Sequence, residues 1–111
     1  MKVTVHVVDS ALGRPAEGVS ARLERQSEGT WTEQARQFTD MGGQAAWEPV
    51  SSAARYVYRL ELDLDAYFSA LGIVPSHPRV IVVFRVLGHA DDEHIHVMIT
   101  PHAQMTYQVR H

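Results

Sequence analysis

Short runs in which apolar and polar side chains alternate make up most of the chain, and this pattern predicts a β protein. In residues 3–9, 19–25 and 55–62, apolar side chains recur at every second position, the period of a strand with one buried face. Glycine, proline and aspartate separate the runs and predict turns between them. The eight predicted strands cover residues 3–9, 19–25, 31–38, 44–47, 55–62, 79–87, 93–99 and 105–109.

The period changes once, in residues 63–72. The apolar side chains from Leu64 to Leu71 recur at helical spacing, an aspartate is available as N-cap, and Gly72 follows as a stop. We therefore expect one short helix after the fifth strand. The run at 79–87 is almost continuously apolar, which predicts a strand buried on both faces. Together these elements predict a single domain, residues 1–111, folded as an all-β, eight-stranded antiparallel Greek-key β-sandwich.

Composition narrows the possible functions. The chain has 45% hydrophobic and 21% charged residues, a balance typical of an ordered globular domain. Its formal charge is -3 and Lys2 is the only basic residue before Arg14, so no basic stripe exists and we expect no nucleic-acid partner. The absence of cysteine excludes disulfides and thiolate catalysis. Because no segment reads as a signal peptide or a membrane span, we expect no membrane association and a cytoplasmic location.

Histidines interrupt two of the predicted strands in the same way. In residues 3–9 the valines at alternate positions share one face, and His6 lies on the other. In residues 93–99, His94 and His96 lie opposite an isoleucine and valine face. If the two strands pair, the imidazoles can meet. Two imidazoles can divide the acid and base tasks of a hydrolysis between them, since one can accept a proton from water while the other protonates a leaving group.

Two other interpretations of these histidines stay open. Each could be a solvated side chain on an exposed sheet face, which is the commonest situation for a single histidine. A metal site is the other, because His94 and His96 share a face of their strand and His6 could complete a three-histidine set of the kind that holds catalytic zinc.

Several short segments follow one another along the chain in a recognisable order. They are His6-Val7-Val8-Asp9, Gly13-Arg14-Pro15-Ala16, the Trp31 strand, Thr39-Asp40-Met41-Gly42-Gly43, Tyr58-Arg59-Leu60, the helix that ends at Leu71-Gly72, His94-Ile95-His96-Val97, Thr100-Pro101 and Met105-Thr106-Tyr107. In these segments the chain resembles the transthyretin and 5-hydroxyisourate hydrolase family. The resemblance implies a transthyretin-like (prealbumin-like) sandwich and a homotetramer, a dimer of dimers around a central channel. It also implies hydrolytic ring opening of 5-hydroxyisourate, a purine-derived substrate of urate catabolism, with no cofactor.

The resemblance also implies roles for individual residues. The hydrolases use an N-terminal histidine and a histidine of an H-x-H motif, and these match His6 and His96, which we therefore expect to be catalytic. They also use an arginine, and here Gln44 stands at that position, so a neutral amide replaces a guanidinium. We expect Gln44 to contact substrate through hydrogen bonds alone, and His94 to line the same site.

The C-terminal Tyr-Arg-Gly-Ser signature of the hydrolases is reduced to Tyr107 here. Tyr107 is predicted either as a pocket hydroxyl or as an interface aromatic. Arg110 lies near the missing signature arginine and could supply a guanidinium to substrate, or could be a solvated terminal residue. These departures leave a second function open: a non-catalytic, transthyretin-like protein that binds a small ligand, or a hydrolase with a shifted substrate.

Overall fold

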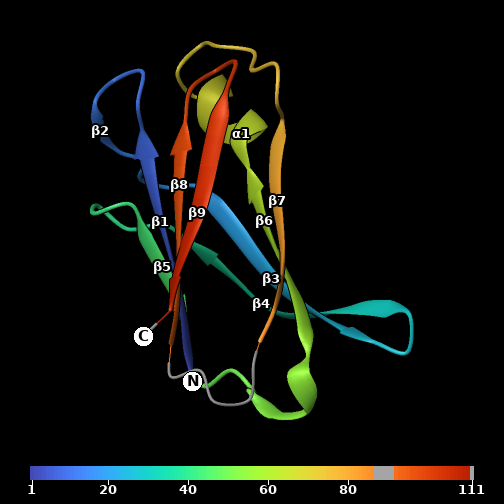
Figure 1. Ribbon diagram of the computed structural model, residues 1–111. Helices are drawn as coiled ribbons and strands as arrows, with labels where there is room; N and C mark the ends of the chain where they lie inside the picture. Colours follow the sequence, from blue (N-terminus) through green and yellow to red (C-terminus); the bar gives the residue numbers. More distant parts are fainter. Residues whose placement is uncertain (87–91, 111) are drawn as a thin grey trace.

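The computed structural model describes residues 1–86 and 92–110, the side chains of Ala54 and Arg110 excepted, and folds them as two β-sheets packed face to face (Figure 1). A short α-helix, α1 (Leu64–Ser69), and one 3-10 turn, η1 (Ala53–Arg55), complete the regular structure in this part of the chain. The strands are β1 (Lys2–Asp9), β2 (Arg14–Pro15), β3 (Ser20–Ser27), β4 (Thr30–Phe38), β5 (Gln44–Trp47), β6 (Val57–Asp63), β7 (Arg79–Arg85), β8 (Asp92–Ile99) and β9 (Gln104–Arg110).

The first sheet has the strand order β2-β1-β8-β9, with β5 also paired to β1, and the second has the order β4-β3-β6-β7. This confirms the predicted all-β sandwich with its single helix. The eight predicted strands are present, and the two-residue β2 is an addition that pairs Arg14 with Asp9 and Pro15 with Val8.

One pairing departs from the predicted antiparallel arrangement. β1 and β8 run parallel, with Val5 opposite Ile95 and His6 opposite His96, so the first sheet is mixed. Alternation of apolar and polar residues is the same in parallel and antiparallel strands, because it reflects only which face each side chain occupies. The sequence pattern therefore predicted the faces and left the strand direction undetermined.

The core lies between the sheets and consists of the side chains that alternation predicted to face inward. Val3, Val5 and Val7 of β1 are fully buried, and so are Leu60 of β6 and Ile95 of β8. This burial of aliphatic side chains is the main stabilising contribution, at roughly 1.5–3 kcal/mol for each fully buried side chain. The outward-facing residues of the same strands are left to form surfaces.

The helix α1 is shorter than predicted and closes one end of the sandwich. Asp63 caps it, since its Oδ1 accepts a hydrogen bond from the Ala66 N–H at 3.1 Å. Leu64 and Phe68 are buried. This is the only helix in residues 1–86 and 92–110, and no helix there is long and apolar enough to span a membrane.

The prediction that residues 79–87 are buried on both faces is wrong for β7. Val80 and Phe84 are buried, but Ile81 and Val83 are 52% and 57% exposed. The reason is the two-layer architecture: the other sheet covers only the inner face of β7, and no third layer lies over its outer face. Residue 87 lies outside the described residues.

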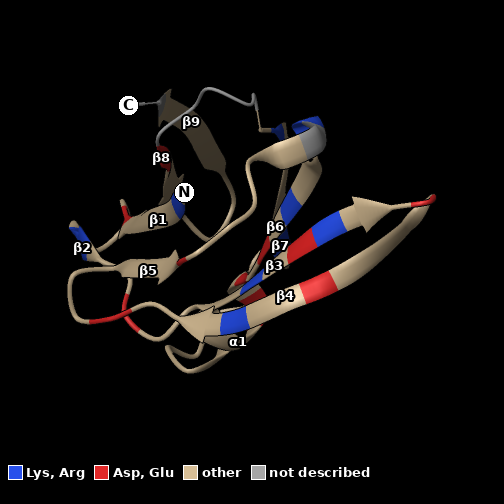
Figure 2. Ribbon diagram, turned by 90° about the horizontal axis from the view of Figure 1, so that it is seen from below, with Lys and Arg blue, Asp and Glu red and all other residues tan. Residues whose placement is uncertain are grey.

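The outer face of the β4-β3-β6-β7 sheet carries paired charges, which Figure 2 shows as blue and red segments along these strands. Arg22 and Arg79 both bond the carboxylate of Glu61, at 2.6 and 3.2 Å. Arg59 Nη2 lies 2.8 Å from Glu24 Oε1. We call this surface the charge-paired face.

Candidate functional site

Four of the predicted site residues form a single row across the outer face of the first sheet. Gln44 of β5 is opposite His6 of β1, His6 is opposite His96 of β8, and His96 is opposite Tyr107 of β9. Their side chains share one face because every pair occupies the same phase of the strand alternation. The pairing register thus brings together residues from four strands, and we call this set the histidine row.

A tight turn positions Gln44 in the row. The Asp40 carboxylate accepts hydrogen bonds from the Gly42 and Gln44 N–H groups at 2.9 and 3.0 Å. Gly43 has a φ of 75°, and a Cβ at this position would collide with the Val7 carbonyl oxygen. Glycine is therefore required for β5 to approach β1 closely enough to place Gln44 beside His6.

The aromatic rings of the row contact one another. His6 and His96 meet edge to face with their centroids 5.8 Å apart and their planes at 68°. Tyr107 stacks on the other side of His96, at 4.7 Å and 7°. Each contact has a geometry that aromatic rings prefer, so His96 is held between two neighbours. The separation of the two imidazoles leaves both within reach of one small molecule that lies over the row.

Burial lowers the pKa of His96 below its ordinary value, and the nearby His6 and His94 imidazoles lower it further. Both effects disfavour the imidazolium, because it is poorly solvated there and would be repelled by a second positive charge. His96 is therefore neutral at pH 7 and can accept a proton. A lowered pKa of this kind suits a general base.

The two rows that flank the histidine row contain no Lys, Arg, Asp or Glu among the described residues. On one side lie Thr4 and its neighbours His94 and Ala46. On the other, Met98 faces Met105 and lines a small hollow of about 200 Å³. The site thus combines titratable imidazoles and hydrogen-bonding groups with an apolar flank, and no permanent charge lies in the row itself.

Comparison with known proteins identifies the family to which this arrangement belongs. The sequence profile of the HIUase/transthyretin family matches residues 3–109. The chain belongs to this family. A relative in Caulobacter vibrioides, named 5-hydroxyisourate hydrolase, is 30% identical over 112 residues that cover 96% of each protein.

Two solved structures of the HIUase/transthyretin family share the fold. Sea bream transthyretin in complex with thyroxine superposes with a TM-score of 0.85 at 27% identity, over 98% of this chain and 95% of that chain. Klebsiella pneumoniae 5-hydroxyisourate hydrolase superposes with a TM-score of 0.84 at 25% identity, over 98% and 99%. These likenesses confirm the family and the transthyretin-like fold predicted from the sequence.

The remaining predicted site residues lie at the margin of the row. His94 is one row away, opposite Thr4 and Val109. Arg110 is paired along the backbone with Glu93, not with His96, and its side chain lies outside the described part of the structure. The alternative of a metal site formed by His6, His94 and His96 gains no support, because no group of three potential metal ligands converges among the described residues.

Sequence reasoning did not single out Met105 as part of this surface. Its side chain is 55% exposed beside Met98, one row from Tyr107. The signal was available, since Met105 and Tyr107 are two positions apart on one strand and therefore share a face. A methionine pair of this kind gives the site a deformable apolar flank.

Proposed function

We propose that this chain hydrolyses 5-hydroxyisourate at the histidine row. The observation that carries the proposal is the contact of the His6 and His96 imidazoles, with ring centroids 5.8 Å apart, in a row that contains no Lys, Arg, Asp or Glu. Its relative in Caulobacter vibrioides carries the name of this activity. Ring opening of a cyclic amide needs a base and an acid close together, and the row supplies both from His96 and His6.

In the proposed reaction, neutral His96 accepts a proton from water as the water oxygen attacks a ring carbonyl carbon. The new C–O bond forms, the ring C–N bond breaks, and His6 donates a proton to the leaving nitrogen. One water is consumed, and proton transfer from His96 to solvent and from solvent to His6 restores the starting state. The lowered pKa of His96 supports its assignment as the base.

Gln44 and Tyr107 would orient the substrate on either side of the imidazoles. The Gln44 side chain has no hydrogen-bond partner among the described residues, so both its amide N–H groups and its carbonyl oxygen are available. Such an amide can pair with an N–H and C=O edge of a ureide ring. Tyr107 holds the plane of His96 by stacking and presents a 49% exposed side chain to the same face.

We further propose a homotetramer, arranged as a dimer of dimers, in which this face encloses the channel that the family resemblance implies. Exposed apolar side chains in and beside the row support this, since Tyr107 of the row is 49% exposed and the neighbouring Met98 and Met105 are 38% and 55% exposed. Contact with a second copy would cover them and exclude water from the site. Light scattering coupled to size exclusion tests the assembly, and a monomer would remove the channel from the proposal.

The activity has a direct assay. 5-Hydroxyisourate is generated in situ from urate, and its decay is followed by absorbance with and without the purified chain. We expect the chain to accelerate the decay and His6→Ala to return it to the spontaneous rate. His102→Ala is the matched control, because His102 is an exposed histidine that bonds Ser76 on another part of the molecule. An unchanged decay rate with a folded protein would refute the hydrolase proposal.

A second candidate function is the binding of a small ligand without chemistry. Gln44 favours it, because the row offers no permanent positive charge to hold a developing anion. The sea bream transthyretin structure contains thyroxine, so the same fold carries a ligand in that protein. Calorimetry with thyroxine and with stable purine analogues tests this function; heat of binding without any acceleration of 5-hydroxyisourate decay would favour it over hydrolysis.

A further inference from the structure

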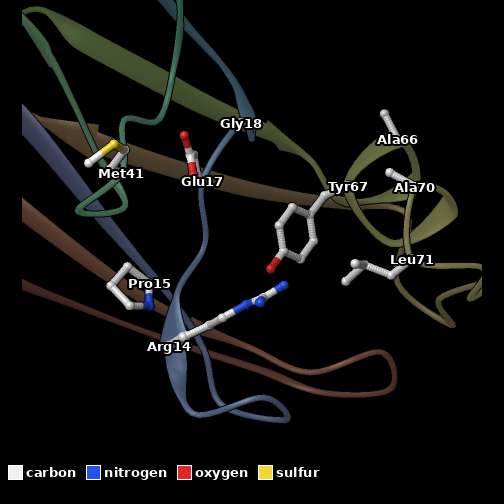
Figure 3. Close-up of a pocket in the computed structure, with 9 residues that line it drawn as sticks. All are labelled: Arg14, Pro15, Glu17, Gly18, Met41, Ala66, Tyr67, Ala70 and Leu71. Atoms are coloured by element: carbon white, nitrogen blue, oxygen red, sulfur yellow. The ribbon is translucent and has the colours of Figure 1, made fainter.

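A second cavity lies at the helix end of the sandwich, and no residue of the histidine row lines it (Figure 3). Its volume is about 550 Å³. Its walls come from residues 14–18, from Met41 in the turn before β5, and from residues 66–71 of α1 and the turn that follows. We call it the arginine cleft, after Arg14. Its size is in the range that small organic ligands occupy.

The base of the arginine cleft is a satisfied hydrogen-bond network. The fully buried Asp9 accepts hydrogen bonds from the Ala11 and Leu12 N–H groups at 3.0 Å, and the Tyr67 hydroxyl donates to its other oxygen at 2.8 Å. Burial and the Asp9 carboxylate raise the pKa of Tyr67 to about 12, so the hydroxyl stays protonated. Asp9 therefore needs no cation to complete its hydrogen bonding, and the interaction that Arg14 makes with this network is with the neutral Tyr67 hydroxyl.

Arg14 extends into the cleft toward Tyr67 (Figure 3). Among the residues that the structure describes, it lies within 4.0 Å of no carboxylate oxygen. Arg22, by contrast, bonds Glu61 at 2.6 Å on the charge-paired face. A guanidinium presents a planar fork of N–H donors that matches a carboxylate, and contact with one neutral hydroxyl leaves most of these donors free, so Arg14 is a recognition group for such an anion.

The walls around Arg14 favour an apolar body on the ligand. Met41 and Leu71 are 80% and 39% exposed, and Pro15 lies between Met41 and Arg14 in the view of Figure 3. Ala66 and Ala70 are small and leave room along the helix wall. Glu17 also lines the cleft, and its negative charge disfavours a ligand with a second anionic group.

We propose that the arginine cleft binds a small organic monocarboxylate with a flat apolar body, the carboxylate on Arg14 and the body between Met41 and Leu71. This site is independent of the histidine row, so it stands whether or not the chain is a hydrolase. It takes an aromatic or alicyclic acid rather than a phosphate, because one guanidinium neutralises one charge and the rest of the cleft offers apolar surface.

The test uses phenylacetate and its uncharged counterpart phenylacetamide as probes in a two-dimensional amide NMR titration of the full chain. We expect phenylacetate to shift the amide signals of Gly18, Ala66 and Ala70, with an affinity about 10-fold above that of phenylacetamide. Arg14→Gln should reduce the affinity for the acid to that for the amide. Arg36→Gln is the matched control, because Arg36 is an exposed arginine of β4 that lies outside the cleft.

Leu71→Gln tests the apolar wall separately and should weaken both probes. Equal affinities for acid and amide, or an unchanged affinity in Arg14→Gln, would overturn the proposal. Shifts confined to signals of the histidine row would overturn it as well. The dispersion of amide signals in each variant's NMR spectrum shows whether that variant is folded. If Arg14→Gln is unfolded, the affinities of Leu71→Gln for the two probes test the site in its place.

Discussion

The outer faces of the two sheets differ in how their polar groups are satisfied. On the charge-paired face, Arg22 and Arg79 share Glu61, so these cations and their carboxylate are engaged within the protein. On the face of β1, β8 and β9, the histidine row holds imidazole, amide and phenol groups with no ion pair among them in the described residues. On the charge-paired face the polar groups bond one another and stabilise the fold. In the histidine row they are available to bind a ligand.

We therefore expect one face to contribute mainly to stability and the other mainly to function. Loss of a group from the charge-paired face should affect the free energy of unfolding, whereas loss of a group from the histidine row should affect chemistry or binding and leave the fold intact. The substitutions below test that separation.

The largest effect is expected for His96→Ala. If His96 is the base, as proposed, its removal should lower the rate of 5-hydroxyisourate hydrolysis by roughly 10²- to 10⁴-fold, the range typical of general acid–base catalysis. The melting temperature should change little, since His96 faces outward and lies outside the core. Steady-state kinetics and a thermal melt measure the two quantities on one sample. A large fall in melting temperature with full activity would contradict the separation of the two faces.

Glu61→Ala should lower stability and leave activity unchanged, the reverse of His96→Ala. It leaves Arg22 and Arg79 without their shared acceptor and should lower the free energy of unfolding by about 1–2 kcal/mol, discounted because both arginines are partly exposed. Activity should stay the same. Urea denaturation gives the stability, and Gln34→Ala on the exposed edge strand β4 is a control that should change it by less than about 0.5 kcal/mol.

Gln44→Arg would introduce the permanent charge that the histidine row lacks. We expect the affinity for urate, an anion at neutral pH, to rise about 10-fold, because a charged donor makes a stronger hydrogen bond to an anion than an amide does. Calorimetry measures this, with Ala46→Arg as the control, since that position is on the same face one row away. An equal gain in both variants would mean that charge anywhere on the face attracts urate.

The smallest effect is expected for His94→Ala, on the pH dependence of kcat/KM. Because the pKa of His96 is lowered, the fraction of neutral base falls only once the pH drops below the ordinary histidine value of 6.5. We therefore expect the fall in kcat/KM on the acid side of its pH profile to lie below pH 6.5. His94→Ala removes one of the imidazoles that lower the pKa of His96, so this acid-side fall should move toward higher pH by less than about one unit. A fall that moves toward lower pH would contradict this account.

Alternation in the sequence predicted the sandwich, its core and the faces of His6 and His96, because each strand displays the same two-residue period that its burial requires. It did not predict which strands are neighbours or in which direction they run, since these depend on how all the strands pack together. The parallel pairing of β1 with β8 came only from the structure.

The exposure of the outer face of β7 could not be predicted from the sequence either. An apolar run such as that of β7 has the same composition whether a second layer covers it or not, so Ile81 and Val83 were predicted to be buried and are exposed. The arginine cleft was not predicted either, because its walls come from segments that lie far apart along the chain and meet only in the folded molecule.

The parallel pairing of β1 with β8 affects the order in which the protein folds. It joins positions 90 residues apart, so β1 can pair with β8 only after the whole segment between them has been synthesised. Pairings of such long range close slowly, because the entropy of a large loop is lost before any contact is gained. Both imidazoles lie on this pair of strands. Recovery of activity after dilution from denaturant should therefore report completion of the whole fold, and should lag behind signals from the local β3–β4 hairpin.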